Sequence, residues 1–181
     1  MPQSKDERIY TIEDIYALPE GERAELIDGK LYYMAAPSMT HQEISMFLSG
    51  TIWNYIRSKK GSCRVFSAPF GVFLDANEKR YFEPDISVIC DKDKLTDRGC
   101  MGAPDWIIEI VSPSSMKMDY GKKLFLYRMA GVREYWVIDS EDGAVFVHDF
   151  EHGEQYLYGL KDKIRAGIYE DFEIDFAELE L

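Results

Sequence analysis

Isolated acidic residues interrupt runs of β-branched and aromatic residues in the segment from Tyr81 to Asp139. Such runs are typical of strands that are buried in a sheet. Asp85 begins one run, and Glu109 stands inside another at residues 106–111. A buried carboxylate is unfavourable unless it is paired with a cation or bound to a metal. The segment therefore predicts strands whose acidic residues have such partners.

The N-terminal part of the chain predicts two helices and a hairpin. Residues 11–18 begin with the form of a capping box, which indicates a short helix. The Asp28-Gly29 pair is typical of a two-residue hairpin turn, so we expect strands at residues 24–27 and 30–34. From residue 40 to about residue 59, apolar residues recur at three- and four-residue spacing, which predicts a long helix with one buried face.

The rest of the chain predicts one more helix among several strands. We expect this helix over residues 119–130, with Gly131 as the glycine that follows its C-terminus. The charged segment 91–102 predicts an irregular surface loop, and we expect the acidic tail, residues 169–181, to pack as an edge. Strands are expected at residues 63–67, 71–74, 85–90, 106–111, 132–138, 144–149, 155–158 and 163–168.

The order of these elements predicts a mixed α/β (α+β) fold. We expect a central mixed β-sheet flanked by helices, with an additional N-terminal hairpin and additional C-terminal strands. The chain has 181 residues, which is close to the size of one ordinary domain, and no repeat or linker divides it. We therefore expect a single domain over residues 1–181.

Composition indicates where the protein resides and what it binds. The formal charge of −12, from 33 acidic and 21 basic residues, repels polyanions unless a divalent cation intervenes. The three cysteines form no C-x-x-C pair, so we expect neither a zinc ribbon nor a disulfide framework, and a reducing compartment fits. Residues 1–8 are polar, and no apolar run approaches the length of a membrane span. We expect a soluble, cytoplasmic protein without a membrane partner.

The two acidic residues in the apolar runs are candidate metal ligands. If their strands are neighbours, Asp85 and Glu109 converge on one point and can hold Mg²⁺, with waters and a backbone carbonyl completing the shell. A cation there polarises a phosphate oxygen and lowers the pKa of a bound water, as phosphodiester hydrolysis requires. Lys122 or Lys123, one helix later, would orient the attacking water or stabilise the developing charge.

The chain contains two Pro-Asp pairs, Pro84-Asp85 and Pro104-Asp105, and their spacing from Glu109 along the sequence distinguishes them. Asp105 lies four residues before Glu109 on the same expected strand, so the two side chains would be about 13 Å apart. Asp85 lies 24 residues before Glu109, which is enough to finish a strand, cross a loop and return. We therefore expect Asp85, and not Asp105, to be the metal ligand.

Several short motifs occur in one order along nearly the whole chain, and together they resemble the Uma family of restriction endonucleases, within the PD-(D/E)XK nuclease superfamily. They are Glu25-Leu-Ile-Asp-Gly29, Pro37-Ser38 with His41-Gln42, Pro84-Asp85, Glu109-Ile-Val111 with Ser112-Pro-Ser after it, Asp119 with Lys123 and Tyr127, and the run Gly131-Val-Arg-Glu-Tyr-Trp-Val-Ile-Asp139.

This resemblance implies a restriction-endonuclease-like core, a four-stranded mixed sheet flanked by helices, that hydrolyses DNA with Mg²⁺, for which Mn²⁺ can substitute. The lysine that the superfamily carries two residues after the glutamate is absent, because position 111 is Val111. Lys123 matches it by its spacing from Asp119 and Tyr127. Glu25 is the match for an auxiliary acid. A homodimer is also implied, and the aromatic segment around Trp136 is a candidate interface.

Simpler structural roles stand beside these expectations. Glu109 and Lys123 can form an ion pair without catalysis, and Lys123 can equally pair with Asp119 on a solvated helix face. His41 at a helix start is either a functional side chain or one that meets solvent or a turn. Glu83 is expected to be an exposed strand-edge acid in preference to a second ligand. Tyr135 and Trp136 are expected in the core or at a dimer interface.

Two further classes of function compete with a nuclease. A nonenzymatic binding or regulatory module that keeps the nuclease fold would explain the charge of −12 and the missing lysine at position 111. A glycosidase would need its two carboxylates at a defined separation around a sugar cleft. No pattern of aromatic subsites supports the glycosidase.

Overall fold

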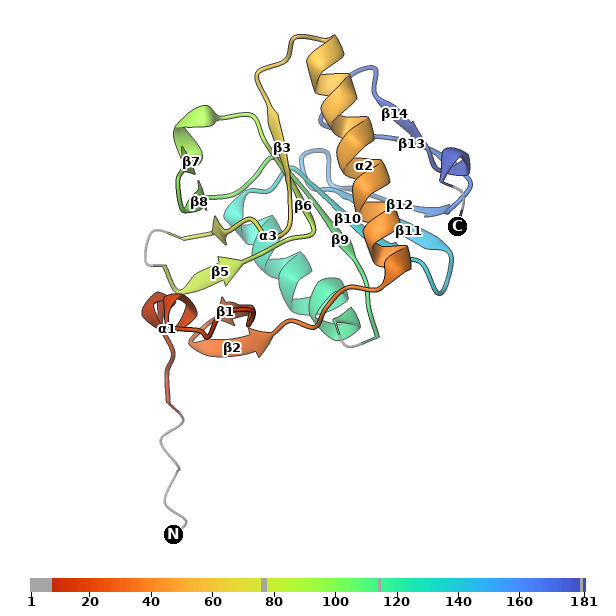
Figure 1. The fold of residues 1–181 in the computed structure, drawn as a ribbon. Coiled ribbons are helices and arrows are strands. Elements are labelled where there is room, and N and C mark those ends of the chain that lie inside the picture. Colours follow the sequence, from red (N-terminus) through yellow and green to blue (C-terminus); the bar gives the residue numbers. More distant parts are fainter. Residues whose placement is uncertain (1–7, 76–77, 114, 180) are drawn as a thin grey trace.

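The computed structural model describes residues 8–75, 78–113, 115–179 and 181. Of the polar segment 1–8, only Arg8 lies within the described residues. Two six-stranded sheets form the framework of the molecule (Figure 1). No helix of the described residues is long and apolar enough to cross a membrane.

The central sheet has the strand order β12-β11-β10-β9-β6-β3. β9 and β10 run parallel, and every other neighbouring pair in this sheet is antiparallel, so the expected central mixed sheet is confirmed. Its strands are β3 (Arg64–Ser67), β6 (Ile86–Ile89), β9 (Trp106–Ile110), β10 (Glu134–Asp139), β11 (Ala144–Asp149) and β12 (Glu154–Gly159).

The second sheet contains the N-terminal hairpin. Asp28 and Gly29 adopt φ values of 50° and 79°, as the expected two-residue turn requires. The prediction of a loop over residues 91–102 was wrong, because two short strands and a 3₁₀ turn, η1 (Lys92–Lys94), form there and bury Cys100. The order is β2-β1-β5-β4-β8-β7, with β1 (Ala24–Ile27), β2 (Lys30–Tyr33), β4 (Val72–Phe73), β5 (Arg80–Phe82), β7 (Leu95–Thr96) and β8 (Gly99–Met101).

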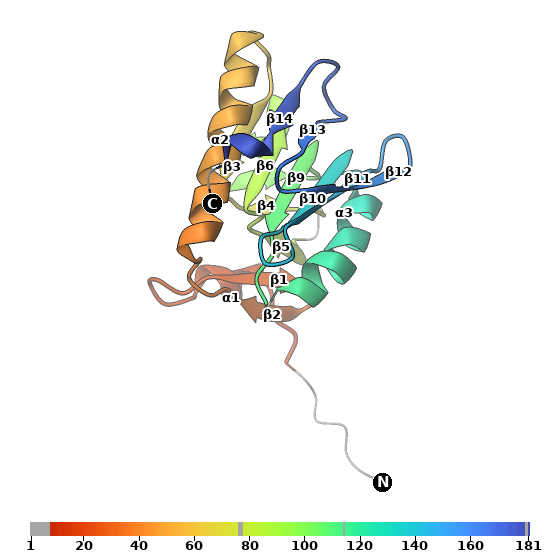
Figure 2. The ribbon, with the colours of Figure 1, turned by 90° about the vertical axis from the view of Figure 1, so that its right-hand side faces the viewer.

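Helices flank the central sheet on both faces, as expected (Figure 2). α2 (Met39–Ser58) covers one face, and α3 (Leu124–Ala130) covers the other. The four-residue repeat of apolar residues in α2 places Ile44, Leu48, Ile52 and Ile56 against the sheet. The short α1 (Ile12–Tyr16) packs against the second sheet, and Asp14 accepts a hydrogen bond of 2.8 Å from the backbone of Thr11.

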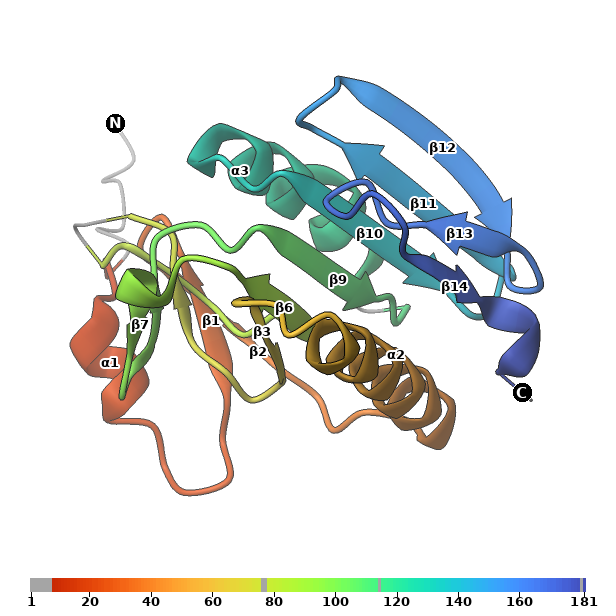
Figure 3. The same ribbon diagram turned by 90° about the horizontal axis from the view of Figure 1, so that it is seen from above.

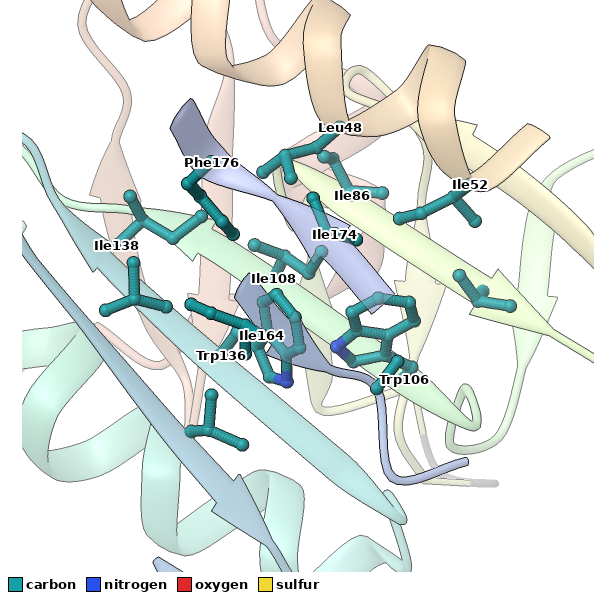
Figure 4. Close-up of a cluster of buried hydrophobic side chains, with 14 of the residues drawn as sticks. Leu48, Ile52, Ile86, Trp106, Ile108, Trp136, Ile138, Ile164, Ile174 and Phe176 are labelled. Atoms are coloured by element: carbon teal, nitrogen blue, oxygen red, sulfur yellow. The ribbon is translucent and has the colours of Figure 1, made fainter. Parts of the chain in front are cut away.

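The acidic tail completes the core beside α2. β13 (Lys163–Arg165) and β14 (Glu173–Asp175) form a separate two-stranded sheet, which the 3₁₀ turn η3 (Phe176–Glu178) follows. Their apolar side chains point into the cluster under α2 (Figure 4), so the tail, for which an edge position was expected, also contributes to the core. Ile164, Ile174 and Phe176 are fully buried there, together with Ile108 and Trp136. Shortening a core residue such as Ile108 to alanine would cost about 2–5 kcal/mol.

Two expectations about particular residues change. Tyr135 and Trp136 are fully buried within the chain, so they are core residues, and the proposed dimer interface at Trp136 is wrong.

Cys63 and Cys90 form a disulfide, which the cysteine spacing did not predict. The two cysteines are 27 positions apart in the sequence, and the antiparallel pairing of β3 and β6 brings them next to each other. The expectation of a cytoplasmic protein therefore loses the support of the cysteine pattern and stays a prediction.

Candidate active site

The antiparallel pairing of β6 and β9 brings Asp85 and Glu109 together. Ile86 is opposite Ile108 in this pair, so Asp85, one residue before β6, is opposite Glu109. The backbone nitrogen of Asp85 lies 3.4 Å from Oε2 of Glu109, and Oδ2 of Asp85 accepts a hydrogen bond of 2.7 Å from the backbone of Ile110. The two candidate ligands are thus adjacent, and the backbone fixes the Asp85 carboxylate.

The side-chain nitrogen of Lys123 contacts three acidic side chains. Its Nζ lies 2.9 Å from Oε1 of Glu25, 3.0 Å from Oε1 of Glu109 and 3.3 Å from Oδ1 of Asp119. The Lys123 side chain is only 5% exposed. We call Glu25, Asp85, Glu109 and Asp119 around this lysine the carboxylate cluster.

Lys122 lies outside the carboxylate cluster. Its Nζ is 3.1 Å from Oδ2 of Asp28 in the hairpin turn, and both side chains are substantially exposed. Of the two lysines considered from the sequence, the structure therefore brings only Lys123 to Glu109.

A π-helical turn presents Lys123 to the carboxylate cluster. The single helix expected over residues 119–130 begins with this turn, η2 (Met118–Lys123), and continues as α3. Tyr135 donates a hydrogen bond of 3.0 Å to the backbone carbonyl of Asp119. Turns of this type often occur at functional sites.

Sequence reasoning did not identify Asp119 and Tyr127 as members of the site. Tyr127 is fully buried and donates a hydrogen bond of 2.9 Å to Oε1 of Glu109, the oxygen that Lys123 also contacts. Asp119, Lys123 and Tyr127 are spaced by four residues, which places them on one face of a helix. A search of this helix face for polar side chains at four-residue spacing would have indicated all three residues as members of the site.

His41 is at the side of the site that meets solvent. It stands in the first turn of α2, where its backbone nitrogen donates to the N-cap hydroxyl of Ser38 at 3.2 Å. Its Nε2 lies 3.1 Å from Oδ1 of Asp85, and the two side chains are 18% and 13% exposed. Burial opposes the charged imidazole, but the hydrogen bond and charge of Asp85 outweigh this and raise the pKa of His41.

Glu83 is buried instead of exposed, which corrects the expectation of a strand-edge acid. Its carboxylate accepts hydrogen bonds of 2.6 Å from Arg23 and 2.7 Å from Tyr81. Arg23 and Tyr81 thus satisfy the Glu83 carboxylate without Lys123, so Glu83 is a structural residue.

The carboxylate cluster contains more acidic than basic side chains. Burial raises the pKa of Glu25, of Glu109 and of Asp119, although the charge of Lys123 opposes each shift. For Lys123, burial disfavours the charge, but the neighbouring Glu109, Glu25 and Asp119 raise its pKa well above the usual value. Lys123 therefore stays charged. Four carboxyl groups lie beside this ammonium and the imidazole of His41, and a divalent cation would reduce the repulsion among those that are ionised.

The donor set suits Mg²⁺. Within the described part of the chain, no three His, Cys, Asp or Glu side chains are arranged as a ready metal site. Mg²⁺, however, usually takes one or two carboxylates from a protein and keeps several waters. Oε1 of Glu109 is occupied by Lys123 and Tyr127, whereas Oε2 has only the 3.4 Å contact to Asp85. Asp85 and Glu109 therefore fit a magnesium ion that they would share with water.

An open surface cavity of about 570 Å³ lies elsewhere. It is lined by Tyr55 and by residues of the C-terminal segment, including Arg165 and Asp171. The chemistry-bearing side chains of the carboxylate cluster do not line it, so we give this cavity no role in the candidate active site.

Comparisons with known proteins match the chain to one family model and to one solved structure. The family model Uma2, described as "Putative restriction endonuclease", matches residues 12–163. A solved structure from Anabaena variabilis, described as "a putative nuclease belonging to DUF820", has a TM-score of 0.75 at 22% identity and covers 93% of this chain and 96% of that chain. This likeness confirms the restriction-endonuclease-like fold.

Two relatives from Synechocystis, both described as uncharacterized proteins, are similar in sequence. The protein slr1290 is 31% identical over 106 residues, which are 59% of this chain and 54% of that protein. The chain thus spans about half the length of this relative. The protein sll1609 is 28% identical over 134 residues, which are 72% of this chain and 71% of that protein.

Proposed function

The chain belongs to the Uma2 restriction endonuclease family, and from this premise we propose that it hydrolyses DNA phosphodiester bonds with Mg²⁺ at the carboxylate cluster. One observation carries the proposal: the Glu109 carboxylate contacts the backbone nitrogen of Asp85 through one oxygen and Nζ of Lys123 through the other, and the three residues come from separate segments. A purely structural ion pair between Glu109 and Lys123 would not need Asp85 or His41 beside it.

We assign metal binding to Asp85 and Glu109, with Mn²⁺ as a substitute ion. When bound, Mg²⁺ would polarise a phosphate oxygen and lower the pKa of a bound water. Asp85 is held for this role by the backbone of Ile110 on one oxygen and by His41 on the other. Glu109 is held by two donors on Oε1, which leaves Oε2 for the cation.

Lys123 organises the carboxylates and does not act as a base. Its pKa is raised well above the usual value, so it carries no free lone pair at neutral pH. Nζ of Lys123 donates a hydrogen bond to Glu109 and lies 2.9 Å from Glu25 and 3.3 Å from Asp119. Lys123 therefore reduces the negative charge that an approaching phosphate meets.

His41 is assigned to the entrance of the site as a positioning residue. It contacts Asp85 and is partly exposed, so it can orient that carboxylate and meet a DNA backbone that approaches the site. Glu25 is assigned as the auxiliary acid that fixes Lys123 from the N-terminal hairpin.

DNA as the substrate is supported by the family. The formal charge of −12 repels a polyanion, so binding of DNA should depend on the divalent cation. The same cation would then both attract the DNA and take part in hydrolysis of the phosphodiester bond.

A second candidate function is a nonenzymatic module that keeps the nuclease fold. The contacts of Lys123 favour it, because a lysine that lies within 3.3 Å of three carboxylates offsets part of their charge without a ligand. Calorimetric titration with Mg²⁺ separates the two. Saturable binding that Asp85→Asn removes supports the nuclease, and no binding supports the module.

The test of the proposed function is cleavage of supercoiled plasmid with Mg²⁺ or Mn²⁺. Asp85→Asn and Glu109→Gln should each abolish nicking. Asp105→Asn is the matched control, because it alters the other Pro-Asp pair, whose carboxylate accepts from the backbone of Cys90 at 2.7 Å outside the carboxylate cluster. Nicking that survives both cluster substitutions, in variants that remain folded, would rule out the assignment.

A further inference from the structure

Residues 44–74 contain no aspartate or glutamate, although the chain has 33 acidic residues among 181. The only charged residues in this segment are Arg57, Lys59, Lys60 and Arg64, and all four are basic and exposed. The segment begins inside α2 and ends just after β4. Three of its four charges follow one another closely at the C-terminal end of α2, so this end of the helix is positive in an acidic chain.

Two of these cations have no ion-pair partner in the described part of the chain. Lys59 contacts Asp171, whereas Arg57 and Lys60 lie in no ion pair. Several other cations are paired with acids: Arg23 with Glu83, Arg80 and Lys122 with Asp28, Arg133 with Glu151, and Lys163 with Asp175. The charges of Arg57 and Lys60 are therefore available to an anion from outside the chain.

An exposed aromatic ring lies beside these two cations. Trp53 is 50% exposed, and its ring centre lies 4.7 Å from the guanidinium of Arg57, one helical turn later. Lys60 follows the helix end, and its backbone nitrogen donates to the carbonyl of Arg57 at 3.1 Å. Figure 3 shows α2 at the outside of the molecule, with the central sheet on its other side. We call Trp53, Arg57 and Lys60 the basic stripe.

Salt lets this local charge act in spite of the net charge of −12. The Debye length is about 10 Å at 0.1 M salt, so an exposed anion responds mainly to charges within that distance. Glu43, the acidic residue of α2, is 14 positions from Arg57, or about 21 Å along the helix axis. The charge of Asp171 is offset by its contact with Lys59. A phosphate beside the basic stripe is therefore attracted, although the chain as a whole repels it.

The basic stripe and the candidate active site lie at opposite ends of α2, which is one continuous helix (Figure 1). His41 contacts Asp85 from the first turn. Arg57 and Lys60 are 16 and 19 positions further along, which corresponds to about 24 and 29 Å along the helix axis. One strand of a DNA duplex advances about 3.4 Å per phosphate, so this separation equals about seven to eight base pairs.

We propose that the basic stripe binds the phosphate backbone of duplex DNA, about seven to eight base pairs from the phosphate that is cut. Arg57 and Lys60 contact phosphates, and the ring of Trp53 holds the guanidinium of Arg57 in place. Such contacts position the duplex and do not read its sequence. The positive charge requires a polyanion as the occupant, and the choice of duplex DNA rests on the proposed function.

Fluorescence anisotropy of a labelled duplex of about 20 base pairs tests the binding. The measurements use Asp85→Asn protein in Mg²⁺, since this substitution should abolish cleavage. In this background, Arg57→Gln with Lys60→Gln should weaken binding about tenfold or more. It should also reduce the slope of log K against log salt concentration by about two, one for each lost phosphate contact. Glutamine removes the charge without placing an acid at a helix C-terminus, and melting temperatures show that the variants are folded.

Lys92→Gln with Lys161→Gln is the matched control. It removes the same charge from two exposed lysines that lie next to Asp91, Asp93 and Asp162 in the sequence. Its affinity and salt slope should equal those of the unsubstituted background. A loss of net charge alone, or a general loss of stability, would not separate the two double variants in this way.

Cleavage by protein with an intact Asp85 tests the distance. On plasmid, Arg57→Gln with Lys60→Gln should raise KM for nicking and leave kcat unchanged, because the basic stripe does not touch the reacting atoms. A duplex of about six base pairs is too short to reach from the carboxylate cluster to the basic stripe. The wild type and the double variant should therefore cut it with the same kcat/KM.

Failure of the basic stripe and failure of the proposed function give different results. Duplex binding that is absent at about 50 mM salt, or that is equal in affinity and salt slope for the two double variants, would overturn the basic stripe. Tighter binding of a single strand of the same length would contradict duplex DNA as its occupant. Nicking that Asp85→Asn abolishes, with KM unchanged by Arg57→Gln and Lys60→Gln, would contradict the basic stripe alone. Stripe-dependent binding by a protein that never nicks DNA would contradict the proposed function alone.

Discussion

The side-chain nitrogen of Lys123 lies 3.0 Å from Oε1 of Glu109, although the residues are 14 positions apart on a helix and a strand. Tyr127 donates to the same oxygen at 2.9 Å. The Glu109 carboxylate is therefore held through one oxygen, and the other oxygen faces Asp85. This asymmetry separates the structural partners of Glu109 from the side on which a metal and a phosphate would bind.

Loss of the lysine should destabilise the fold strongly. Lys123→Met leaves Glu25, Glu109 and Asp119 buried without their cation, and removal of one partner from a buried ion pair costs about 3–5 kcal/mol. Guanidinium denaturation at pH 7.5 measures this. Lys122→Met is the matched control, because its exposed pair with Asp28 contributes about 0–1 kcal/mol. Equal losses in the two variants would contradict the placement of Lys123.

The destabilisation by Lys123→Met should depend on pH. Without the lysine, the pKa values of Glu25, Glu109 and Asp119, which burial already raises, rise further. A carboxyl group with a raised folded-state pKa stabilises the fold below its unfolded pKa of about 4, and this contribution is lost as pH rises through the folded pKa. The difference in unfolding free energy between wild type and variant should therefore grow from pH 4 to pH 7.5. A difference that shrinks over this range would show that the acids are not in contact with Lys123.

Tyr127→Phe should loosen Glu109 without removing any charge. Loss of a hydrogen bond to a charged group lowers stability by about 1.5–3 kcal/mol, and nicking should fall because Oε2 is no longer held toward Asp85. Tyr81→Phe is the comparison, since its hydroxyl donates to Glu83 at 2.7 Å, outside the carboxylate cluster. It should lose similar stability and keep its activity. Denaturation and plasmid nicking are measured side by side, and full activity in Tyr127→Phe would remove this residue from the site.

The disulfide predicts a specific count of thiols. Unfolded, non-reduced protein should react with one equivalent of a thiol reagent, at Cys100, and folded protein should react slowly because burial raises the pKa of that thiol to about 11. Cys63→Ser should lower stability by about 3–4 kcal/mol under oxidising conditions, since the bond closes a loop of 27 positions. Three thiols in the unfolded, non-reduced protein would show that Cys63 and Cys90 are not joined.

Local patterns along the chain predicted those elements whose structure depends on near neighbours. The hairpin at Asp28-Gly29 follows from turn chemistry, and the boundaries of α2 differ by only one residue from those expected from its apolar period. In the structure, Glu109 contacts both the backbone of Asp85 and the side chain of Lys123. Their roles in catalysis remain proposals.

What sequence patterns did not predict depends on residues far apart in the chain. β5 has only three residues, too few to show a period, and it is defined by its pairing with β1 and β4. Glu83 appeared exposed because its partner Arg23 is 60 positions away. Cys63 and Cys90 are likewise joined by strand pairing. Such contacts are set by the packing of the whole chain, which local propensity does not describe.

A crystal soaked in millimolar Mn²⁺ and measured for anomalous scattering locates the cation itself. We predict one peak at about 2.0–2.2 Å from carboxylate oxygens of both Asp85 and Glu109, with Lys123 still in contact with Oε1 of Glu109. The peak should be absent from a Glu109→Gln crystal treated in the same way. No peak between Asp85 and Glu109, or one that persists in the variant, would contradict a metal-dependent nuclease at this site.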